Sequence, residues 1–179
     1  MADARSKLLQ RVMDEVGMNG LADRSLRELA TAIDSSHRML IFHFGSRAGL
    51  LSAVVEAVES AQRDLLEELA DEVSDPGELV LLLWERVSSP ELLPFVRLFF
   101  ECVAMADGQD LSGSWIATAE TVADKLQIEF DETELRMGMA VTRGLLIDVL
   151  ATGDVAPATR SIERFVEIWD PANRGSSAA

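Results

Sequence analysis

Residues 21–51 read LADRSLRELATAIDSSHRMLIFHFGSRAGLL, and this stretch decides the fold that we expect. Ser25 and Glu28 have the spacing of a capping box, in which each side chain accepts a hydrogen bond from the backbone N–H of the other residue. Three apolar residues then recur at a helical spacing: Leu26, Leu29 and Ile33. The stretch therefore predicts a short helix with one apolar face.

The residues Asp34-Ser35-Ser36 interrupt this pattern, because short polar side chains bond to the nearby backbone and favour turns and caps. A second short helix is predicted over residues 37–44, with Leu40 and Phe44 on its inner side. Two short helices joined by a tight turn make a helix-turn-helix, whose second helix can enter the DNA major groove.

The second helix and its flank resemble the DNA-binding motif of the tetracycline-repressor-like (TetR) family of transcriptional regulators. The matching residues are Leu40-Ile41-Phe42-His43-Phe44, Ser46-Arg47 and Leu50-Leu51, and Arg27-Glu28-Leu29-Ala30 is similar to the first motif helix. The resemblance implies a homodimeric, ligand-responsive regulator that reads a palindromic operator in double-stranded DNA. Repression is the usual outcome in this family.

Three positions depart from the family pattern. Ile41 stands where the family usually has a tyrosine whose hydroxyl meets a phosphate, and the chain contains no tyrosine. Gly45 stands where proline is common, and Asp34 where glycine is frequent. Aspartate can adopt the left-handed conformation at modest cost, so the turn remains feasible. The operator sequence cannot be predicted from this motif.

The composition is that of a globular protein. The chain has 179 residues, of which 48% are hydrophobic and 26% charged, enough for one or two cores. The single Cys102 fits a reducing compartment. The N-terminus lacks the apolar segment of a signal peptide, and the longest apolar run, Leu79–Trp84, is too short for a membrane span. We expect a cytoplasmic protein without a membrane partner.

The net charge of −15 is unevenly distributed along the sequence. Residues 1–50 hold seven basic and six acidic residues, which leaves nine of the 16 basic and twenty-five of the 31 acidic residues to 51–179. Only the N-terminal part tolerates phosphate, and an acidic body would limit non-specific DNA binding. The alternative is that the acidic residues simply solvate the surface.

The rest of the sequence predicts further helices and no strand, so the expected fold is all-α with about nine helices. The domains that we expect are a helix-turn-helix domain at 1–50, a helical ligand-binding and dimerisation domain at 51–172, and a disordered tail at 173–179. A long helix over residues 46–73 links the two domains, and its Glu59 and Arg63 are expected to face solvent as a pair.

The exposed side of the second motif helix carries the candidate DNA contacts. The Arg38 guanidinium can bond O6 and N7 of guanine, His37 can donate to an acceptor, and Met39 can contact a thymine methyl. The predicted DNA-binding residues are Ser25, Arg27, Ser36, His37, Arg38, Met39, Phe42, His43, Ser46 and Arg47. The alternative is that they are ordinary solvated polar residues.

A group of large side chains in the middle of the chain suggests a pocket for an apolar small-molecule effector. Its residues are Trp84, Phe95, Phe99, Phe100, Cys102, Met105 and Trp115. Their spacing alone favours a packed core, and only the family resemblance makes a pocket comparably plausible. In a dimer, an effector that binds better when the two helix-turn-helix domains are at one separation would raise the population of molecules with that separation, and the long helix could transmit the change.

The last two long helices are predicted to form the homodimer interface, as the matching helices do in the TetR family. The helix near Leu135–Leu150 is apolar on two sides, which is typical of a helix shared between a core and a partner. The predicted interface residues are Leu135, Met139, Thr142, Leu146, Val149, Ile162, Phe165, Val166 and Trp169.

Two other classes of function remain as alternatives. An enzyme is disfavoured because His37 and His43 point to different sides of a helix and no catalytic or phosphate-binding motif is present. We therefore predict no catalytic residue, no metal ligand and no cofactor. A helical interaction protein whose head no longer binds DNA specifically is the second alternative, favoured by the acidity and by Ile41.

Overall fold

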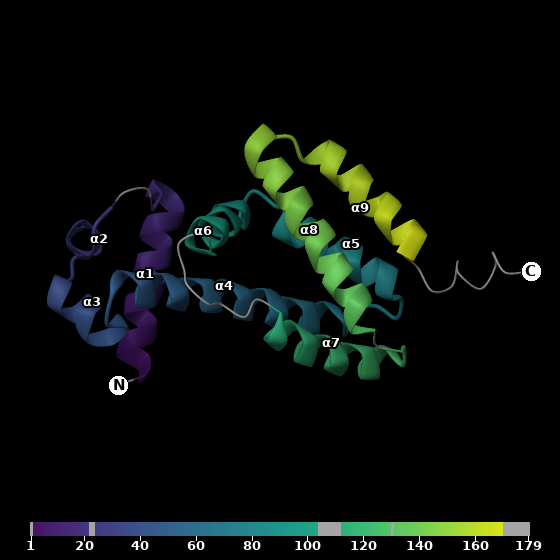
Figure 1. Ribbon diagram of the computed structural model, residues 1–179, viewed down its shortest axis with the longest axis horizontal. Helices are drawn as coiled ribbons and strands as arrows, with labels where there is room; N and C mark the ends of the chain where they lie inside the picture. The colour runs from purple at the N-terminus through teal and green to yellow at the C-terminus, as the bar shows by residue number, and fades with distance from the viewer. Residues whose placement is uncertain (1, 22–23, 104–111, 130, 170–179) are drawn as a thin grey trace, which may run out of the picture. The chain divides into compact units, whose positions relative to one another are not determined.

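The computed structural model describes residues 2–21, 24–103, 112–129 and 131–169 (Figure 1). Within these ranges the chain forms nine helices and no strand, which confirms the predicted all-α class. The helices are α1 (Ala2–Asn19), α2 (Leu26–Ala32), α3 (His37–Phe44), α4 (Arg47–Leu69), α5 (Pro76–Val87), α6 (Leu93–Val103), α7 (Gly113–Leu126), α8 (Glu132–Thr152) and α9 (Val155–Trp169). The predicted tail at 173–179 and Met105 lie outside the described residues.

The chain folds into two compact units, which we call unit 1 and unit 2. Unit 1 comprises Met1–Ala61 and Pro94–Gln109, and unit 2 comprises Gln62–Leu93 and Asp110–Ala179. The predicted domains, 1–50 and 51–172, stay a prediction, because the two units are a division by contacts within the chain. The structure groups α6 and the first turns of α4 with the N-terminal helices, because these segments supply part of the core of unit 1.

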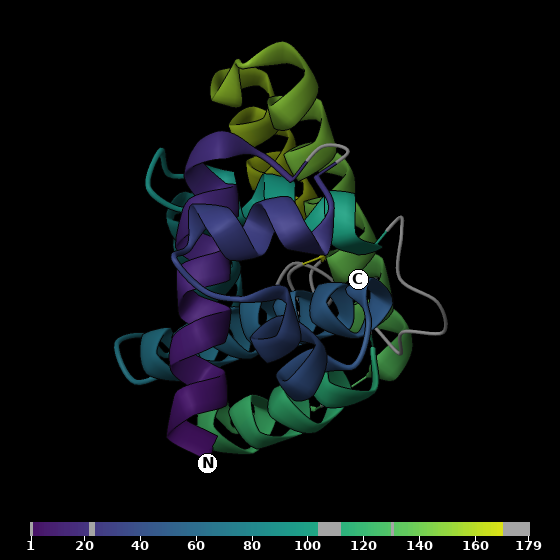
Figure 2. The same ribbon diagram turned by 90° about the vertical axis from the view of Figure 1, so that its left-hand side faces the viewer.

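The core of unit 1 is built from the apolar faces of α1, α2, α3, α4 and α6. The predicted inner residues Leu29 and Leu40 are fully buried, as are Val12 and Val16 of α1. Figure 2 shows α1 beside α2 and α3. Helix α6 buries Val96, Phe99 and Cys102 in this unit. Packing these faces together removes apolar surface from water, which is the main stabilising contribution to such a small unit.

One side of α4 differs from the prediction. Glu59 was expected to face solvent, but only 3% of its surface is exposed. The reason is that α4 is covered on two sides in unit 1, where Val54, Val55 and Val58 are all buried around the same turns. A helix buried on two sides has no single polar face, so a one-face pattern misplaces residues at its edges.

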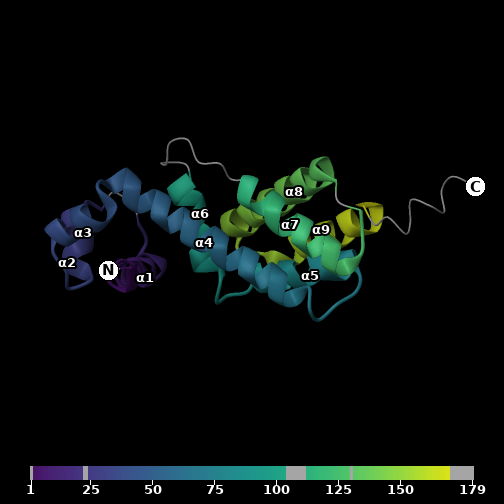
Figure 3. The same cartoon turned by 90° about the horizontal axis from the view of Figure 1, so that it is seen from below.

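Unit 2 contains the end of α4 with α5, α7, α8 and α9, and α9 packs against both α5 and α8 (Figures 1 and 3). The Trp84 indole N–H donates to the Thr159 hydroxyl at 3.0 Å, which ties α5 to α9. At Gly77 a Cβ would lie 2.8 Å from the Val166 side chain, so the first turn of α5 requires glycine for this close approach. The predicted caps form at Asp75 and Asp131.

No single described helix is long and apolar enough to cross a membrane. Only α3 and α4 taken together pass the test of length and composition, and they are bent by 66° where they meet.

The Cys102 thiol should react with thiol reagents only when unit 1 opens. The side chain is fully buried, and burial, aided by the Glu101 carboxylate and opposed by Arg47, raises the thiol pKa to about 12. The thiolate is the reacting species, so labelling at pH 8 should be about a thousandfold or more slower in the native protein than in the denatured chain. A stopped-flow thiol-exchange assay in buffer and in denaturant measures this ratio. Comparable rates would contradict the burial of Cys102.

Candidate DNA-contacting face and candidate ligand pocket

Helix α3 presents one buried and one exposed side. Leu40 and Phe44 are buried in unit 1, and the Ser36 hydroxyl caps the helix by accepting from the Met39 N–H at 3.2 Å. The opposite side exposes most of the residues that the sequence singled out: His37, Arg38, Met39 and Phe42. Within the described part of the chain, Arg38 makes no hydrogen bond or ion pair, so its guanidinium is available to a ligand.

The turn between α2 and α3 has the geometry expected of a helix-turn-helix. Asp34 adopts the left-handed conformation with φ of 49°, which aspartate tolerates at modest cost. The Ser35 N–H donates to the Ala30 carbonyl at 2.8 Å, and the Asp34 N–H donates to the Thr31 carbonyl at 3.1 Å. This pair of bonds is a Schellman motif, which satisfies the last carbonyls of α2 and fixes the direction in which α3 leaves.

Arg11 on α1 holds this turn from outside, a role that the sequence did not reveal. Its guanidinium donates to the Ile33 carbonyl and, at 3.3 Å, to the Asp34 carbonyl. A cation beside the C-terminal carbonyls of a helix also interacts favourably with the helix dipole. We expect Arg11 to set the position of α3 relative to α1. No local pattern marks such a contact, because its partners are backbone atoms 22 and 23 residues away.

Replacing Arg11 by methionine should loosen the turn, because it removes the guanidinium and keeps an unbranched apolar side chain of similar length. Losing hydrogen bonds from a charged group costs about 1.5–3 kcal/mol, and we expect the lower end because Arg11 is exposed. Cys102 labelling, which depends on the opening of unit 1, should become about tenfold faster. Arg27→Met on exposed α2 is the charge-matched control. Equal labelling rates in the two variants would show that Arg11 does not stabilise the turn between α2 and α3.

Several predicted DNA-binding residues already have partners within unit 1. The Ser25 hydroxyl and the Ser25 N–H both donate to the Glu28 carboxylate at 2.7 Å. These two hydrogen bonds, the one from the hydroxyl first, are the main reasons that the pKa of Glu28 is lowered. The Ser46 hydroxyl accepts from the Gly49 N–H at 3.0 Å, and half-buried Arg47 donates to the Arg24 carbonyl at 3.4 Å. These residues hold the motif together, whatever else they contact.

The remaining two candidates differ in exposure. Arg27 is exposed on α2, whereas His43 is half-buried and its ring lies between those of Phe42 and Phe44. Gly45, which departs from the family pattern, ends α3 with φ of +75°. This conformation is costly for residues with a Cβ, so glycine at this position is explained by the geometry of the α3–α4 corner.

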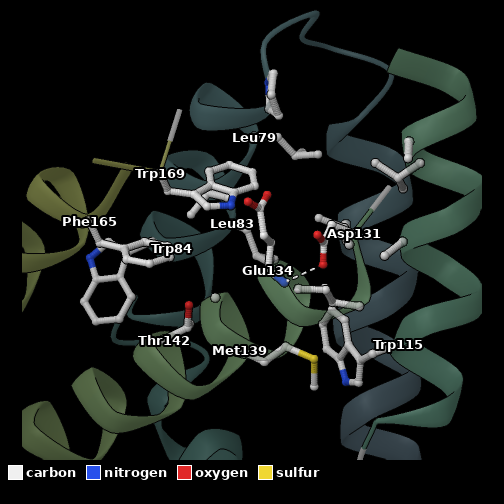
Figure 4. A pocket seen from close by; sticks show the side chains of 18 of the residues that line it. Leu79, Leu83, Trp84, Trp115, Asp131, Glu134, Met139, Thr142, Phe165 and Trp169 are labelled. Carbon is white, nitrogen blue, oxygen red and sulfur yellow. Dashed lines mark hydrogen bonds between the residues drawn. The ribbon is translucent and has the colours of Figure 1, made fainter. Parts of the chain in front are cut away.

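Unit 2 contains a cavity of about 210 Å³ among α4, α5, α7, α8 and α9. Figure 4 shows its lining, with Trp84, Trp115 and Trp169 reaching it from three different helices. Most of the lining is apolar, and the main contributors are Leu66, Leu79, Leu83, Trp84, Trp115, Val122, Leu126, Leu135, Met139, Leu146, Phe165 and Trp169. A largely apolar concavity with a few polar groups is typical of a small-molecule site.

Three of the six polar or charged residues that line this cavity are acidic. Glu129, Asp131 and Glu134 line it beside a single arginine, Arg143. Asp131 is also the N-cap of α8, where it accepts from the N–H groups of Thr133 at 2.7 Å and Glu134 at 3.2 Å. Figure 4 shows the carboxylates of Asp131 and Glu134 together in the region between Trp169 and Trp115.

The indole nitrogens of two lining tryptophans are buried without an acceptor. Within the described residues, neither the Trp115 nor the Trp169 N–H has a hydrogen-bond partner. An unpaired buried donor costs roughly 1–3 kcal/mol, so such groups are normally satisfied by protein or by a bound molecule. Both tryptophans line the cavity, but their nitrogen atoms are themselves buried in protein, so the two N–H groups are not counted among the groups that face a ligand.

The pocket predicted from the sequence is only partly the cavity of unit 2. Trp84 and Trp115 line the cavity, as expected. The α6 residues do not: Phe95, Phe99, Phe100 and Cys102 belong to unit 1. Phe99 and Cys102 are buried there, in agreement with the core interpretation, and the Phe95 ring lies 3.6 Å from the Cβ position of Gly17. Met105 lies outside the described residues.

The residues predicted for a dimer interface lie on the inner side of unit 2. Leu146, Val149, Ile162 and Val166 are buried within a single chain, because α8 and α9 pack on each other and α9 packs on α5. Side chains so buried have no surface left for a second chain. The other five predicted residues line the cavity: Leu135, Met139, Thr142, Phe165 and Trp169. The other side of α8 is exposed and still apolar.

Comparisons with known proteins bear on the whole chain. No protein-family model matches the sequence, and no curated protein matches it. Among solved structures, the TetR-family transcriptional regulator PfmR from Thermus thermophilus superposes with a TM-score of 0.57 at 19% identity, covering 91% of this chain and 96% of that chain. The chain has the TetR-family fold.

Two further structures with this fold are described by their ligand or target. The multidrug-binding protein EbrR in complex with ethidium is 22% identical, with a TM-score of 0.67, and the match covers 89% of this chain and 96% of that chain. SmeT, the repressor of a multidrug efflux pump of Stenotrophomonas maltophilia, is 16% identical, with a TM-score of 0.61, over 92% of this chain and 88% of that chain. The TetR fold thus extends over both units.

Proposed function

We propose that this chain is a homodimeric, ligand-responsive DNA-binding transcriptional regulator that reads a palindromic operator through α2 and α3. The observation that carries the proposal is the exposed side of α3, where Arg38, which has no partner among the described residues, lies with His37, Met39 and Phe42 within a TetR fold. Repression is the default that the fold favours. A regulator of this kind acts where the chromosome lies, in the cytoplasm.

The exposed residues of α3 supply complementary kinds of contact with DNA. Arg38 can bond O6 and N7 of a guanine, and His37 can donate to a base or phosphate acceptor. Met39 and Phe42 are 41% and 69% exposed and can contact thymine methyl groups. Helix α4 begins beside exposed Ser46, and the N-terminus of a helix suits a phosphate.

The missing tyrosine lowers the number of phosphate contacts. Ile41 is 38% exposed, so an apolar side chain occupies the surface where the family usually places a hydroxyl. Phosphate contacts supply much of the affinity that is independent of sequence and lost with salt. We therefore expect weak non-specific binding, which suits a chain with a net charge of −15.

A second copy of the chain is proposed to pack on the exposed side of α8, which we call the α8 stripe. The stripe consists of Met137, Ala140, Gly144, Ile147 and Ala151, at alternating steps of three and four residues. Met137 and Ile147 are both 52% exposed, and the small residues between them allow close approach of a partner helix. A two-fold dimer formed here would match the symmetry of a palindromic site.

The cavity of unit 2 is proposed to bind the effector. Its largely apolar walls, with three tryptophans among them, support this assignment. EbrR, which shares the fold, binds ethidium, so the fold accommodates flat organic molecules. Helix α4 begins in unit 1 and ends in unit 2, and its last turns line the cavity, so it is the element through which ligand binding would affect the head.

Selection from random DNA duplexes with the purified protein tests the proposal, with binding measured over a series of salt concentrations. The expected result is enrichment of one palindrome whose half-sites lie one helical turn, or a multiple, apart. Affinity for the palindrome should exceed that for random duplex by about a thousandfold or more. Absence of any enriched sequence at low salt would reject specific DNA recognition and favour the helical interaction protein with a diverged head.

A further inference from the structure

We infer that the operator half-site is read mainly through the C5 methyl groups of thymine, in a core of A·T pairs that holds one G·C pair. The inference rests on the proposed function, because it names the class of sequence that α3 recognises. Three features of unit 1 carry it: an exposed apolar surface on α3, the absence of acidic residues around that surface, and the length of the helix.

The apolar surface, which we call the α3 apolar band, consists of Met39, Ile41 and Phe42. They are 41%, 38% and 69% exposed, and they are three of the four exposed large apolar side chains in the described part of unit 1. At 3.6 residues per turn, Phe42 lies about 40° and Met39 about 100° from Arg38 on one side, and Ile41 about 60° on the other. The band adds nothing to the core of unit 1, and an exposed apolar group of this kind marks an interaction surface.

The residues around the band indicate that the partner is a polyanion. Residues 35–55 contain no Asp or Glu, although the chain holds 31 of them. The same stretch contains Arg38, Arg47 and both histidines of the chain. A protein partner would tolerate carboxylates beside the band, whereas a row of phosphates would be repelled by them. The distribution of charge therefore favours DNA over a second protein surface.

The major groove offers the band one apolar group. Thymine presents its C5 methyl there, while adenine, guanine and cytosine present only polar groups along their edges. The Phe42 ring is already held for such a contact, because it packs edge-on against the half-buried His43 ring at a centroid distance of 5.0 Å. A ring that is held in place loses less conformational freedom on binding.

The length of α3 limits the number of base pairs that it can read. Eight residues at 1.5 Å each span about 12 Å, which corresponds to about four base pairs at 3.4 Å each. The Arg38 guanidinium suits a single guanine, and the three side chains of the α3 apolar band are left for the other positions. The expected core is therefore about four base pairs with one G·C pair and thymine methyl groups at the rest.

Deoxyuridine provides the probe, because it pairs with adenine as thymidine does and lacks only the C5 methyl group. We would select from two random duplex libraries in parallel, one with thymine and one with uracil in its place. A palindrome should be enriched from the thymine library, and the same sequence should not be enriched from the uracil library. Uracil at one symmetric pair of core thymines should lower affinity by about tenfold or more, because each buried methyl contributes roughly a fourfold gain.

A double-mutant cycle links the methyl group to the side chain. Phe42→Ala should weaken binding of the thymine operator by about fivefold or more and bring the thymine-to-uracil affinity ratio at its contacted pair below about two. Met39→Ala and Ile41→Ala are tested in the same way at the other pairs. Arg38→Ala is the matched control, because it should weaken both duplexes equally and keep the ratio. Thiol labelling of buried Cys102 should be unchanged in all four variants, which checks that unit 1 is folded.

The outcomes separate this inference from the proposed function. An enriched palindrome that tolerates uracil at every core position, or that has a core of G·C pairs, would overturn the inference alone. So would a uracil effect that persists in all three band variants, because the methyl would then act through the shape of the duplex. Band variants that bind DNA like the parent and self-associate less would assign the band to a protein interface and overturn it too. If the thymine library yields no enriched sequence, specific DNA recognition fails and this inference fails with it.

Discussion

Replacing Ile147 by glutamate is expected to convert the dimer into a monomer. Ile147 lies within the α8 stripe and is 52% exposed, so a charge there does not disturb the core of unit 2. In a two-fold interface the substitution occurs on both chains, and like charges brought together cost several kcal/mol. We expect the dimer dissociation constant to rise by about a hundredfold or more, measured by sedimentation velocity over a range of protein concentrations.

Operator binding should also be weakened when the dimer dissociates. A single head makes only half of the base contacts, so affinity for the palindrome should fall by about a hundredfold or more at nanomolar protein. Ile168→Glu is the control, because Ile168 is a 63% exposed apolar residue on α9 in unit 2, outside both the α8 stripe and the DNA-binding unit, and the change adds the same charge. A dimeric Ile147→Glu protein would show that the second copy does not pack on the α8 stripe.

Replacing Arg38 by alanine is expected to lower operator affinity by about 1–3 kcal/mol, which is roughly 5- to 150-fold. The guanidinium is exposed at the start of α3 and makes no bond within the described chain, so its loss should leave unit 1 as stable as before. Binding to a set of operators with single base changes should show relaxed preference at one position. Arg38→Lys should be intermediate, because an ammonium cannot reproduce the planar pair of bonds.

Random DNA separates the two roles that Arg38 can play. If Arg38 reads a base, binding to random duplex should change little while operator binding falls. If the losses on operator and on random DNA are equal, Arg38 is a phosphate contact and base reading must lie elsewhere on α3. Arg160→Ala on exposed α9 removes the same charge far along the chain and should leave both affinities unchanged.

The helix-turn-helix was predictable because its signals are local. The Ser25–Glu28 capping box, the left-handed Asp34 and the inner residues Leu40 and Phe44 all follow from spacings of a few residues. Each such signal reflects backbone hydrogen bonds that form within one or two turns. Arg11 was missed because its acceptors are backbone carbonyls in another helix, and any exposed arginine on α1 had the same local pattern.

The location of the pocket and the exposed side of α8 could not be predicted, because both depend on contacts between segments that are distant in the sequence. Phe99 and Cys102 have the spacing of a buried helix face, but the spacing does not tell which unit buries them. Helix α8 is apolar on two sides, and the sequence could not show that the side with Leu146 and Val149 faces its own chain. In retrospect the small residues Ala140 and Gly144 distinguish the exposed side, because a core position would favour larger side chains.

The distribution of tryptophan and cysteine gives the protein a natural means of measuring communication between its parts. The lone thiol lies in unit 1, and every indole lies in unit 2. Titrating a cavity probe while following thiol exchange would therefore yield the coupling free energy between ligand binding and opening of the head, from unlabelled wild-type protein and before any operator is known. By linkage, whatever free energy the ligand imposes on the head, the head must impose on the ligand.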